Sequence, residues 1–350
     1  MKHSKGTHVM KLCVLLLGLV LFVLCDEVEG FEAGAPRDVE NATASAAVLA
    51  SVMPSAPASE GGNATDNATD DAKDGPTDPS PGARWVEPRT GMAFRWVPQG
   101  CFRMGSPKTE PGRNVDEGPQ HEVCLSGFWL GETEVTQGQW TNIMGANPSL
   151  IKSGDDYPVD MVSWDMAQEF VAALNVLNAG TFRLPTEAEW EYACRAGTTT
   201  PFFFGQEITR DQASFDKRFS LPAEPLMPKR KTKKKKTAAK RQKKIWPNMH
   251  TSVVGSYPAN AYGLHDMHGN VWEWCQDVYK AEYYFRSPRE NPRCDGEGAS
   301  RVLRGGSWVT KGDALRSANR SRGWPNLSTA FYGLRVVFSA QATGAPKISR

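Results

Sequence analysis

The stretch from Arg301 to Val337 begins RVLRGGSW, continues through LRSANR and ends GLRVV, and it decides most of what the sequence says about the fold. No cysteine occurs in this stretch, because the last cysteine of the chain is Cys294. Its final part is a long irregular connection in which Trp324 and Tyr332 are flanked by Gly, Pro and Asn. Large aromatic side chains in such loops are typical of recognition surfaces. The stretch therefore predicts a ligand-binding region near the C-terminus of a folded domain.

The folded domain extends outward from this stretch over residues 85–340. The domain is rich in tryptophan and glycine and has few long periodic segments. This composition favours an irregular, loop-rich α+β fold over a helical bundle or a doubly wound sheet. We expect the domain to be a monomer.

The first 30 residues have the pattern of a signal peptide. Three lysines precede a 14-residue apolar run, Leu12 to Cys25, which is too short for a membrane span. A cleavage site after Gly30 predicts a protein without an integral span that is periplasmic, secreted or surface-associated. Cys25 is an alternative lipoprotein cysteine, but the large Leu24 before it favours cleavage.

Three segments outside the domain core are predicted to be unstructured. Residues 31–84 are mostly small and polar, so they cannot bury enough apolar surface to offset the entropy of ordering and form a linker. Residues 341–350 form a tail. Lys229 to Lys244 carries 11 Lys or Arg in 16 residues, so the rest of this +2 chain carries −9. This insertion is either a binding site for a polyanion or a solvated loop without a partner.

Local patterns predict a hairpin and the first helix. The alternation in GMAFRWVPQGCFRMG, Gly91 to Gly105, indicates a hairpin of half-buried strands. Thr136 and Gln139 form a T-x-x-Q capping box, so a helix begins there and directs Trp140, Ile143 and Met144 inward.

Two further helices follow. Residues Asp165 to Leu177 place their apolar side chains on one face. The segment Phe182 to Gly197 contains the third helix, with Thr186 as N-cap, Glu189 completing the capping box and Gly197 as the left-handed stop. The charged side chains of this segment are expected to form internal ion pairs rather than to act as catalytic acids; they are Arg183, Glu187, Glu189 and Glu191.

Five cysteines remain after signal cleavage, and export to an oxidising compartment favours their pairing. Cys101 with Cys124, and Cys275 with Cys294, each bracket a short loop, so these are the predicted disulfides. Cys194 lies on the apolar stripe of the third helix and is predicted to be a buried thiol.

Four motifs resemble the formylglycine-generating, or sulfatase-modifying factor, family. They are MAFRWVPQGCFRMGS from Met92, FWLGETEVTQGQW from Phe128, NAYGLHDMHGNVWEW from Asn260, and the RGGSW to GLRVV frame. The resemblance covers about 250 residues, from Trp85 to Val337, and implies a C-type-lectin-like architecture.

The resemblance also implies a calcium ion at the NAYGLHDMHGNVWEW motif. Its ligands would be Glu273 and largely backbone groups of His268, Gly269, Asn270 and Val271. Hard oxygen ligands on an irregular turn suit Ca²⁺. Zinc is the weaker alternative, because His265 and His268 have no evident third ligand. In a second alternative, Asn270 and Glu273 only satisfy buried backbone groups.

In the family, two cysteines after the G-G-S triplet bind Cu(I), which activates oxygen to oxidise a substrate cysteine to formylglycine. Here Thr310 and Leu315 stand at those positions, in the loop that begins at Ser307. Neither side chain replaces a thiolate, the ligand that Cu(I) prefers. Copper-dependent oxidase activity is therefore not expected, and no catalytic residue is assigned.

The same region lines a ligand groove in this family. The corresponding residues are Trp308, Asp313, Arg316, Asn319, Arg320, Trp324 and Tyr332. They predict a groove for a peptide, a protein or a small molecule, although Arg316 and Arg320 are alternatively buried partners of acids. Two other functions stay open: a C-type-lectin-like ligand-binding surface protein, of the kind that retroelements diversify in some relatives, and a non-copper enzyme that matures a periplasmic metabolite, with Asp313 as its acid.

Overall fold

A five-stranded antiparallel sheet joins the two ends of the domain in the computed structural model, which describes residues 79–150, 152–177, 181–216 and 251–339. The strand order is β1-β2-β5-β11-β6. The strands span Arg84–Val86 (β1), Ala93–Val97 (β2), Phe128–Gly131 (β5), Val337–Ser339 (β11) and Thr181–Arg183 (β6). Because β11 pairs with β5, the last strand of the domain closes onto a strand near its beginning.

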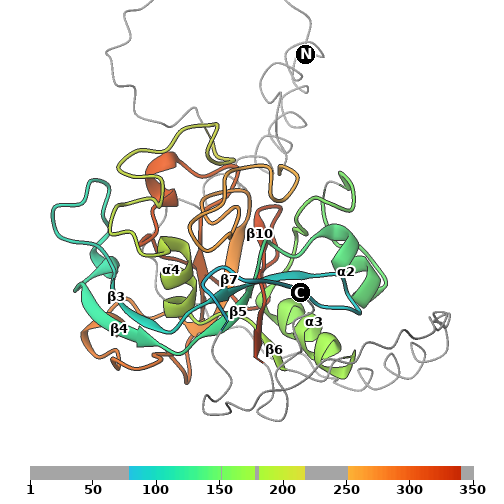
Figure 1. Ribbon diagram of the computed structural model, residues 1–350, viewed down its shortest axis with the longest axis horizontal. Helices are drawn as coiled ribbons and strands as arrows, with labels where there is room; N and C mark the ends of the chain where they lie inside the picture. Colours follow the sequence, from blue (N-terminus) through green and yellow to red (C-terminus); the bar gives the residue numbers. More distant parts are fainter. Residues whose placement is uncertain (1–78, 151, 178–180, 217–250, 340–350) are drawn as a thin grey trace, which may run out of the picture. The chain divides into compact units, whose positions relative to one another are not determined.

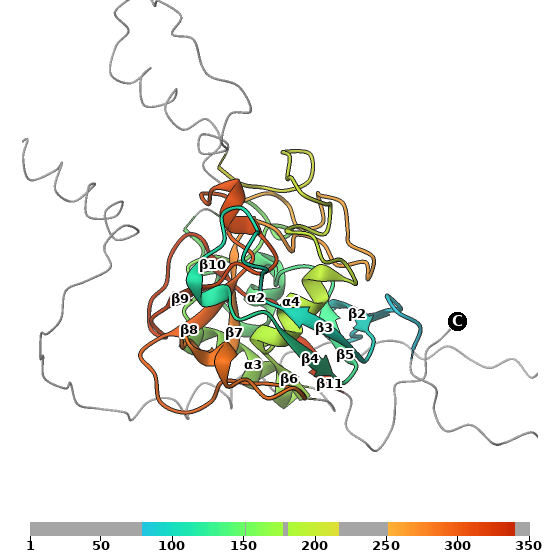
Figure 2. The same cartoon turned by 90° about the vertical axis from the view of Figure 1, so that its left-hand side faces the viewer.

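Two smaller sheets complete the β structure of the described residues. The four-stranded sheet has the order β10-β7-β8-β9, with β10 parallel to β7, and Figure 2 shows β7, β8 and β9 next to one another. Its strands span Trp272–Val278 (β7), Arg301–Arg304 (β8), Ser321–Gly323 (β9) and Tyr332–Gly333 (β10). The third sheet pairs β3, Gly100–Met104, with β4, His121–Leu125. These sheets with few helices confirm the predicted irregular α+β class.

The predicted hairpin between Gly91 and Gly105 is wrong in its pairing. Both strands exist, as β2 and β3, but β2 pairs with β1 and β5 whereas β3 pairs with β4. The alternation in the sequence reports only that each strand has one buried face. It does not report which strand lies beside it.

The helices begin where the capping residues predict. Helix α2, Gln137–Met144, has Thr136 as N-cap, with Gln139 completing the capping box. Helix α3 spans Trp164–Leu177, and helix α4 spans Glu187–Arg195 with the Thr186 and Glu189 capping box. Figure 1 shows α2 and α3 on the opposite side of the domain from β3 and β4.

Each helix directs its apolar face into the core. The ring of Trp140 on α2 stacks on that of Phe170 on α3, with the ring centroids 4.9 Å apart. At the end of α4 the left-handed position is Ala196, with φ +43°, and Gly197 follows with φ +90°. The predicted stop therefore lies one residue early and uses two left-handed residues. Three short 3-10 helices among the described residues are η2 at Val115–Glu117, η4 at Tyr283–Phe285 and η5 at Gly312–Leu315.

One of the two predicted disulfides is present. Cys101 and Cys124 are bonded across β3 and β4, whereas Cys275 and Cys294 are buried free thiols. Cys294 accepts a hydrogen bond from Val278 N at 2.9 Å, so it lies opposite a residue three positions beyond Cys275 on β7. At about 3.3 Å per residue this places the two cysteines roughly 10 Å apart along the strand, beyond the reach of a disulfide. Cys194 is a buried free thiol, as predicted.

Several predicted segments lie outside the described residues. They are the signal peptide at residues 1–30, nearly all of the 31–84 linker, the basic insertion Lys229 to Lys244 and the 341–350 tail. Polyanion binding by the basic insertion stays a prediction. Within the described ranges, no helix has the length and apolar character that crossing a membrane requires.

Candidate functional site

The loop after β8 is closed by glycine geometry and by a short hydrogen-bonded turn. Gly305 and Gly306 have φ values of +92° and +83°, and a Cβ atom on Gly306 would lie 2.9 Å from the side chain of Leu315. Ser307 N donates to Thr310 Oγ1 at 2.9 Å, and Thr310 N donates to Ser307 O at the same distance. The hydroxyls of Ser307 and Thr310 also lie 2.9 Å apart. The two hydroxyls therefore satisfy each other within the turn.

Leu315 fills the interior of the loop. Its side chain is fully buried against Phe202 and Ala213. Its carbonyl oxygen lies 2.7 Å from Nδ1 of His268, and a carbonyl oxygen only accepts, so Nδ1 carries the hydrogen. The loop is thus packed on its apolar side and hydrogen-bonded on its polar side.

A buried thiol and an imidazole lie beneath this loop. The Sγ atom of Cys194 lies 3.8 Å from Nε2 of His268 and 3.5 Å from the hydroxyl of Ser317. Burial raises the pKa of Cys194 to about 12 and lowers the pKa of His268 to about 4. Both groups are therefore neutral at physiological pH, and the pair is not a thiolate–imidazolium nucleophile.

Two arginines predicted to line the ligand groove are instead buried ion-pair partners. Arg316 donates to Glu110 and Glu117 at 2.7 Å, and Arg320 donates to Glu187 at 2.7 and 2.9 Å. Burial raises the pKa of Glu117, but hydrogen bonding and the charge of Arg316 bring it below the usual value. A guanidinium group that is withdrawn from water requires a carboxylate partner. The partner acids of these two arginines lie far away in the sequence. The prediction of Arg316 and Arg320 as ligand residues is therefore wrong.

Asn319 and Tyr332 are also buried, so their assignment to a groove is wrong too. Asn319 accepts a hydrogen bond from Asn114 Nδ2 at 3.0 Å. Tyr332, on β10, packs edge-on against Trp274 with a centroid distance of 5.2 Å. Trp308 is half-buried, with its indole N–H donating to Ala330 O at 3.1 Å.

Asp313 and Trp324 are the exposed members of the predicted groove. Trp324 is 55% exposed, directly after the edge strand β9. The backbone holds it in place, because Leu327 N donates to Trp324 O at 2.9 Å and Asp165 N donates to Pro325 O at 3.1 Å. A backbone segment held in this way loses little further entropy when a ligand covers the exposed indole.

Two cation–aromatic pairs involve arginines of the paired strands β8 and β9. The guanidinium of Arg322, on β9, lies 4.9 Å from the ring centroid of Tyr279. The guanidinium of Arg301, which pairs with the end of β9, lies 4.0 Å from the ring centroid of Trp164. With Trp324 they form what we call the β9 surface: Trp164, Tyr279, Arg301, Arg322 and Trp324.

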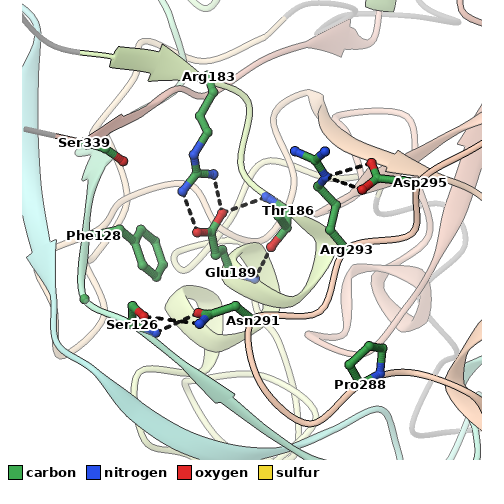
Figure 3. A pocket seen from close by; sticks show the side chains of 11 residues that line it. Ser126, Phe128, Arg183, Thr186, Glu189, Pro288, Asn291, Arg293, Asp295 and Ser339 are labelled. Carbon is green, nitrogen blue, oxygen red and sulfur yellow. Dashed lines mark hydrogen bonds and ion pairs between the residues drawn. The ribbon is translucent and has the colours of Figure 1, made fainter. Parts of the chain in front are cut away.

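A separate pocket of about 570 Å³ lies among β5, β6, the start of α4 and the segment before β8. Figure 3 shows the Arg183–Glu189 ion pair on one wall and Arg293 with Asp295 on the other. None of its lining residues was a predicted ligand residue. The ion pair between Arg183 and Glu189 agrees with the internal ion pairs expected for this segment. Glu187 and Glu191 also form such pairs, with the buried side chains of Arg320 and Arg304.

The comparison with protein families decides the identity of the domain. The model of the sulfatase-modifying factor enzyme 1-like domain matches residues 86–340. The chain belongs to the sulfatase-modifying factor family. The formylglycine-generating enzyme of Streptomyces coelicolor is 30% identical over 332 aligned positions, which cover 76% of this chain and 94% of that enzyme. A serine/threonine-protein kinase, pkn1 of Chlamydia caviae, is 33% identical, but the chain spans only 38% of its length.

Two solved structures share the fold. PvdO from Pseudomonas aeruginosa has a TM-score of 0.61 and 26% sequence identity, covering 75% of this chain and 99% of PvdO. Variable protein 1 of Treponema denticola has a TM-score of 0.58 and 22% identity, covering 73% of this chain and 98% of that protein. The second likeness concerns the fold alone.

The copper site that this family implies does not fit the residues of the loop. Thr310 offers a hydroxyl that is already bonded to Ser307, and Leu315 offers no donor atom. The thiol of Cys194 beneath the loop is buried, and burial raises its pKa to about 12, so it is not a thiolate. Cu(I) requires soft ligands close together, and this loop provides none.

The calcium ligands that the family motif implies are engaged with other protein groups. Glu273 accepts from Arg335 at 2.9 Å and from the indole N–H of Trp190 at 2.7 Å. Asn270 accepts from Ser252 N at 2.9 Å. The side chains of His268 and Val271 are buried, and Gly269 has no room for a Cβ atom beside Ser214 O. These side chains thus satisfy buried protein groups, as the alternative interpretation has it, and calcium binding by the backbone groups of this motif stays a prediction.

Two nearby carboxyl groups fit a hard cation better. Both oxygens of Glu134 and Oδ1 of Asp266 are buried without a hydrogen-bond partner. Burial, followed by the charge of Asp266, raises the pKa of Glu134 well above its usual value. Buried orphan oxygens of this kind suit Ca²⁺, which takes oxygen ligands in irregular geometry. Sequence reasoning missed them, although Asp266 lies inside the quoted motif and Glu134 inside the FWLGETEVTQGQW motif.

Proposed function

We propose that this chain is an exported, peptide-binding member of the sulfatase-modifying factor family in which copper-dependent oxidation has been lost. The observation that carries the proposal is Trp324, an exposed indole on a backbone segment held by hydrogen bonds directly after an edge strand. The packed Thr310 and Leu315 loop supports the loss of copper chemistry.

The occupant that best suits the β9 surface is an extended peptide with acidic side chains. Among the described strands, β9 pairs only with β8, so its other edge can accept the backbone hydrogen bonds of an added strand. Arg301 and Arg322 supply positive charge beside this edge, and Trp324 supplies apolar contact area. Electrostatic complementarity then favours acidic ligands over basic ones.

Selection from a library of displayed random 12-residue peptides on the purified full chain tests this function. We expect acidic sequences to be enriched, and a synthetic copy of an enriched peptide to bind about 30-fold more weakly to Trp324→Ala, since central aromatic anchors contribute about 2 kcal/mol. Phe285→Ala, which removes another exposed ring outside β9, is the matched control and should bind normally. Failure to enrich any sequence, or equal binding by both variants, would overturn the proposal.

We also propose that a calcium-type ion is held beside Glu134 and Asp266 in a structural role. The support is the orphan oxygens of these two buried carboxyl groups and the nearby charge of Glu273. A bound divalent cation would neutralise this buried negative charge, so it would stabilise the connection between β5 and α2.

A further inference from the structure

We propose that strands β3 and β4 contain a redox-gated site for a divalent cation of the zinc class, formed by Cys101, Cys124 and Glu122 when the disulfide is reduced. Their potential ligand atoms all lie within 4.8 Å of one another, and within the described part of the chain they form the sole such group of three. Neither the peptide-binding proposal nor the calcium proposal uses these residues.

The strand pairing places all three side chains on one face. Cys101 lies directly opposite Cys124 in the β3–β4 register. Glu122 precedes Cys124 by two residues, and side chains two residues apart in a strand share a face. Directly opposed side chains have Cβ atoms about 4.5–5.5 Å apart, so two separated thiolates can both reach one ion at about 2.3 Å.

The ligand arrangement leaves the fourth position of a tetrahedral ion open. Cys101 and Glu122 are exposed and Cys124 is buried, so an ion can enter from solvent and retain a water molecule. Two thiolates and one carboxylate form a donor set that zinc accepts and that Ca²⁺, which prefers oxygen alone, does not.

The scaffold around the site does not depend on the disulfide. Cys124 N donates to Arg289 O at 2.7 Å, and Asn291 N donates to Cys124 O at 2.8 Å. These bonds attach the segment after η4 to the free edge of β4. The β3–β4 ladder itself, with Cys101 opposite Cys124, consists of backbone pairing that does not involve the S–S bond, so we expect the two strands to keep the thiols opposed after reduction.

The gating step is an ordinary thiol–disulfide exchange. A dithiol reductant supplies two electrons and two protons, the Cys101–Cys124 bond breaks to give two thiols, and the reductant becomes a disulfide. Binding of one divalent ion then releases the two thiol protons and forms two metal–thiolate bonds. In the oxidised chain neither sulfur is a thiolate, so the site is closed.

Arg289 competes with the ion for the carboxylate. Its Nε atom donates to Glu122 at 2.7 Å, and its Nη2 atom lies 3.9 Å from Sγ of Cys101. The guanidinium is exposed, so it can leave when an ion arrives. Its positive charge opposes a cation at the same place, which gives Arg289 and Glu122 opposite effects on metal affinity.

Titration of the full chain with Co²⁺, a coloured substitute for Zn²⁺, tests the proposal. The chain is reduced with dithiothreitol, freed of reductant without air and compared with the oxidised chain. We expect one equivalent of Co²⁺ to produce thiolate-to-cobalt charge-transfer absorption in the reduced chain alone, and Zn²⁺ to displace it. Circular dichroism of the reduced chain should match that of the oxidised chain.

Substitutions separate this site from the other thiols. Cys101→Ser with Cys124→Ser should abolish the absorption, and Glu122→Gln should weaken binding roughly tenfold or more. Arg289→Gln should strengthen binding about two- to fivefold, the effect of removing one exposed competing charge. Glu282→Gln, a matched surface change at an exposed carboxylate that pairs with Arg286 rather than Arg289, should leave the affinity unchanged.

Four outcomes would overturn the proposal. They are absorption that persists in the double serine variant, equal binding by the oxidised chain, no binding by the reduced chain, and loss of the fold on reduction. In the first case other thiols bind the ion, and in the last the strands do not hold the ligands together.

Discussion

At the scale of single residues, the buried carboxyl group of Glu134 makes the stability of the fold depend on pH. Its pKa is raised by burial and by the charge of Asp266, from an unfolded value near 4.5. The neutral form therefore stabilises the fold fully below pH 4.5, and this contribution is lost as the pH rises through the folded-state pKa. A bound cation would offset this loss of stability, because it favours the ionised form of the carboxylate.

The first prediction concerns this carboxyl group. In the presence of a chelator, the unfolding free energy of the wild-type chain should fall between pH 5 and pH 8 by about 1 kcal/mol or more relative to Glu134→Gln, because one pKa unit corresponds to about 1.4 kcal/mol. Ca²⁺ should restore the stability of the wild type but not that of Glu134→Gln. Urea denaturation at the two pH values measures both effects.

Glu132→Gln is the matched control for this prediction. Its carboxylate lies two residues earlier and is ion-paired with Arg84 at 2.7 Å, so the substitution should preserve the calcium response. An equal response to Ca²⁺ in the wild type and in Glu134→Gln would show that the ion, if bound at all, lies elsewhere.

At the scale of elements, helix α4 connects the predicted site loop to the core through buried ion pairs. Glu191 accepts from Arg195 at 2.9 Å and also binds Arg304, and all three side chains are almost fully buried. Arg304 in turn donates to the carbonyl oxygens of Ala318 at 2.9 Å and Ser317 at 3.0 Å. One carboxylate therefore fixes both the end of α4 and the segment after the loop.

The second prediction follows from this arrangement. Glu191→Ala should reduce the unfolding free energy by about 3–5 kcal/mol, because it leaves buried guanidinium groups without their carboxylate. Glu282→Ala removes the exposed partner of Arg286 and should cost less than about 1 kcal/mol. Urea denaturation checks both variants, and a similar small cost for the two would show that Glu191 is not a structural centre.

Elements that depend on local chemistry were predictable from the sequence, and elements that depend on partners were not. The capping boxes at Thr136 and Thr186 use atoms within four residues of each other, so a short motif is sufficient to predict where each helix begins. The pairing of β2 and β3 depends on strands that lie elsewhere in the chain. The predicted disulfide between Cys275 and Cys294 is absent for the same reason. The length of the loop between two cysteines does not tell where each lies along its strand.

At the scale of the whole molecule, the family motifs predicted the fold. Which of the predicted site residues face solvent depends on long-range packing. Arg316 binds Glu117, which lies 199 residues earlier, and Arg320 binds Glu187, which lies 133 residues earlier. No local pattern tells such an arginine from one that faces a ligand. The same holds for the aromatic residues: the local Gly, Pro and Asn pattern predicted exposure for both Trp324 and Tyr332, but only Trp324 is exposed, because Tyr332 packs against Trp274.

The same long-range packing means that the proposed loss of copper chemistry involves more than two missing cysteines. Leu315 is part of a buried cluster with Phe202 and Ala213, and its carbonyl oxygen holds the imidazole of His268. The loop has thus become a packed element of the domain. Binding at the β9 surface, on the outer edge of the four-stranded sheet, does not require it to open.

The most direct test is a Cu(I)- and oxygen-dependent turnover assay of the full chain on a peptide containing C-x-P-x-R, followed by mass spectrometry. The formylglycine-generating enzyme of Streptomyces coelicolor serves as the positive control. Our account predicts no aldehyde product from this chain while that enzyme converts the peptide. Conversion by this chain would contradict the account, because it would require a copper site that Thr310 and Leu315 do not provide.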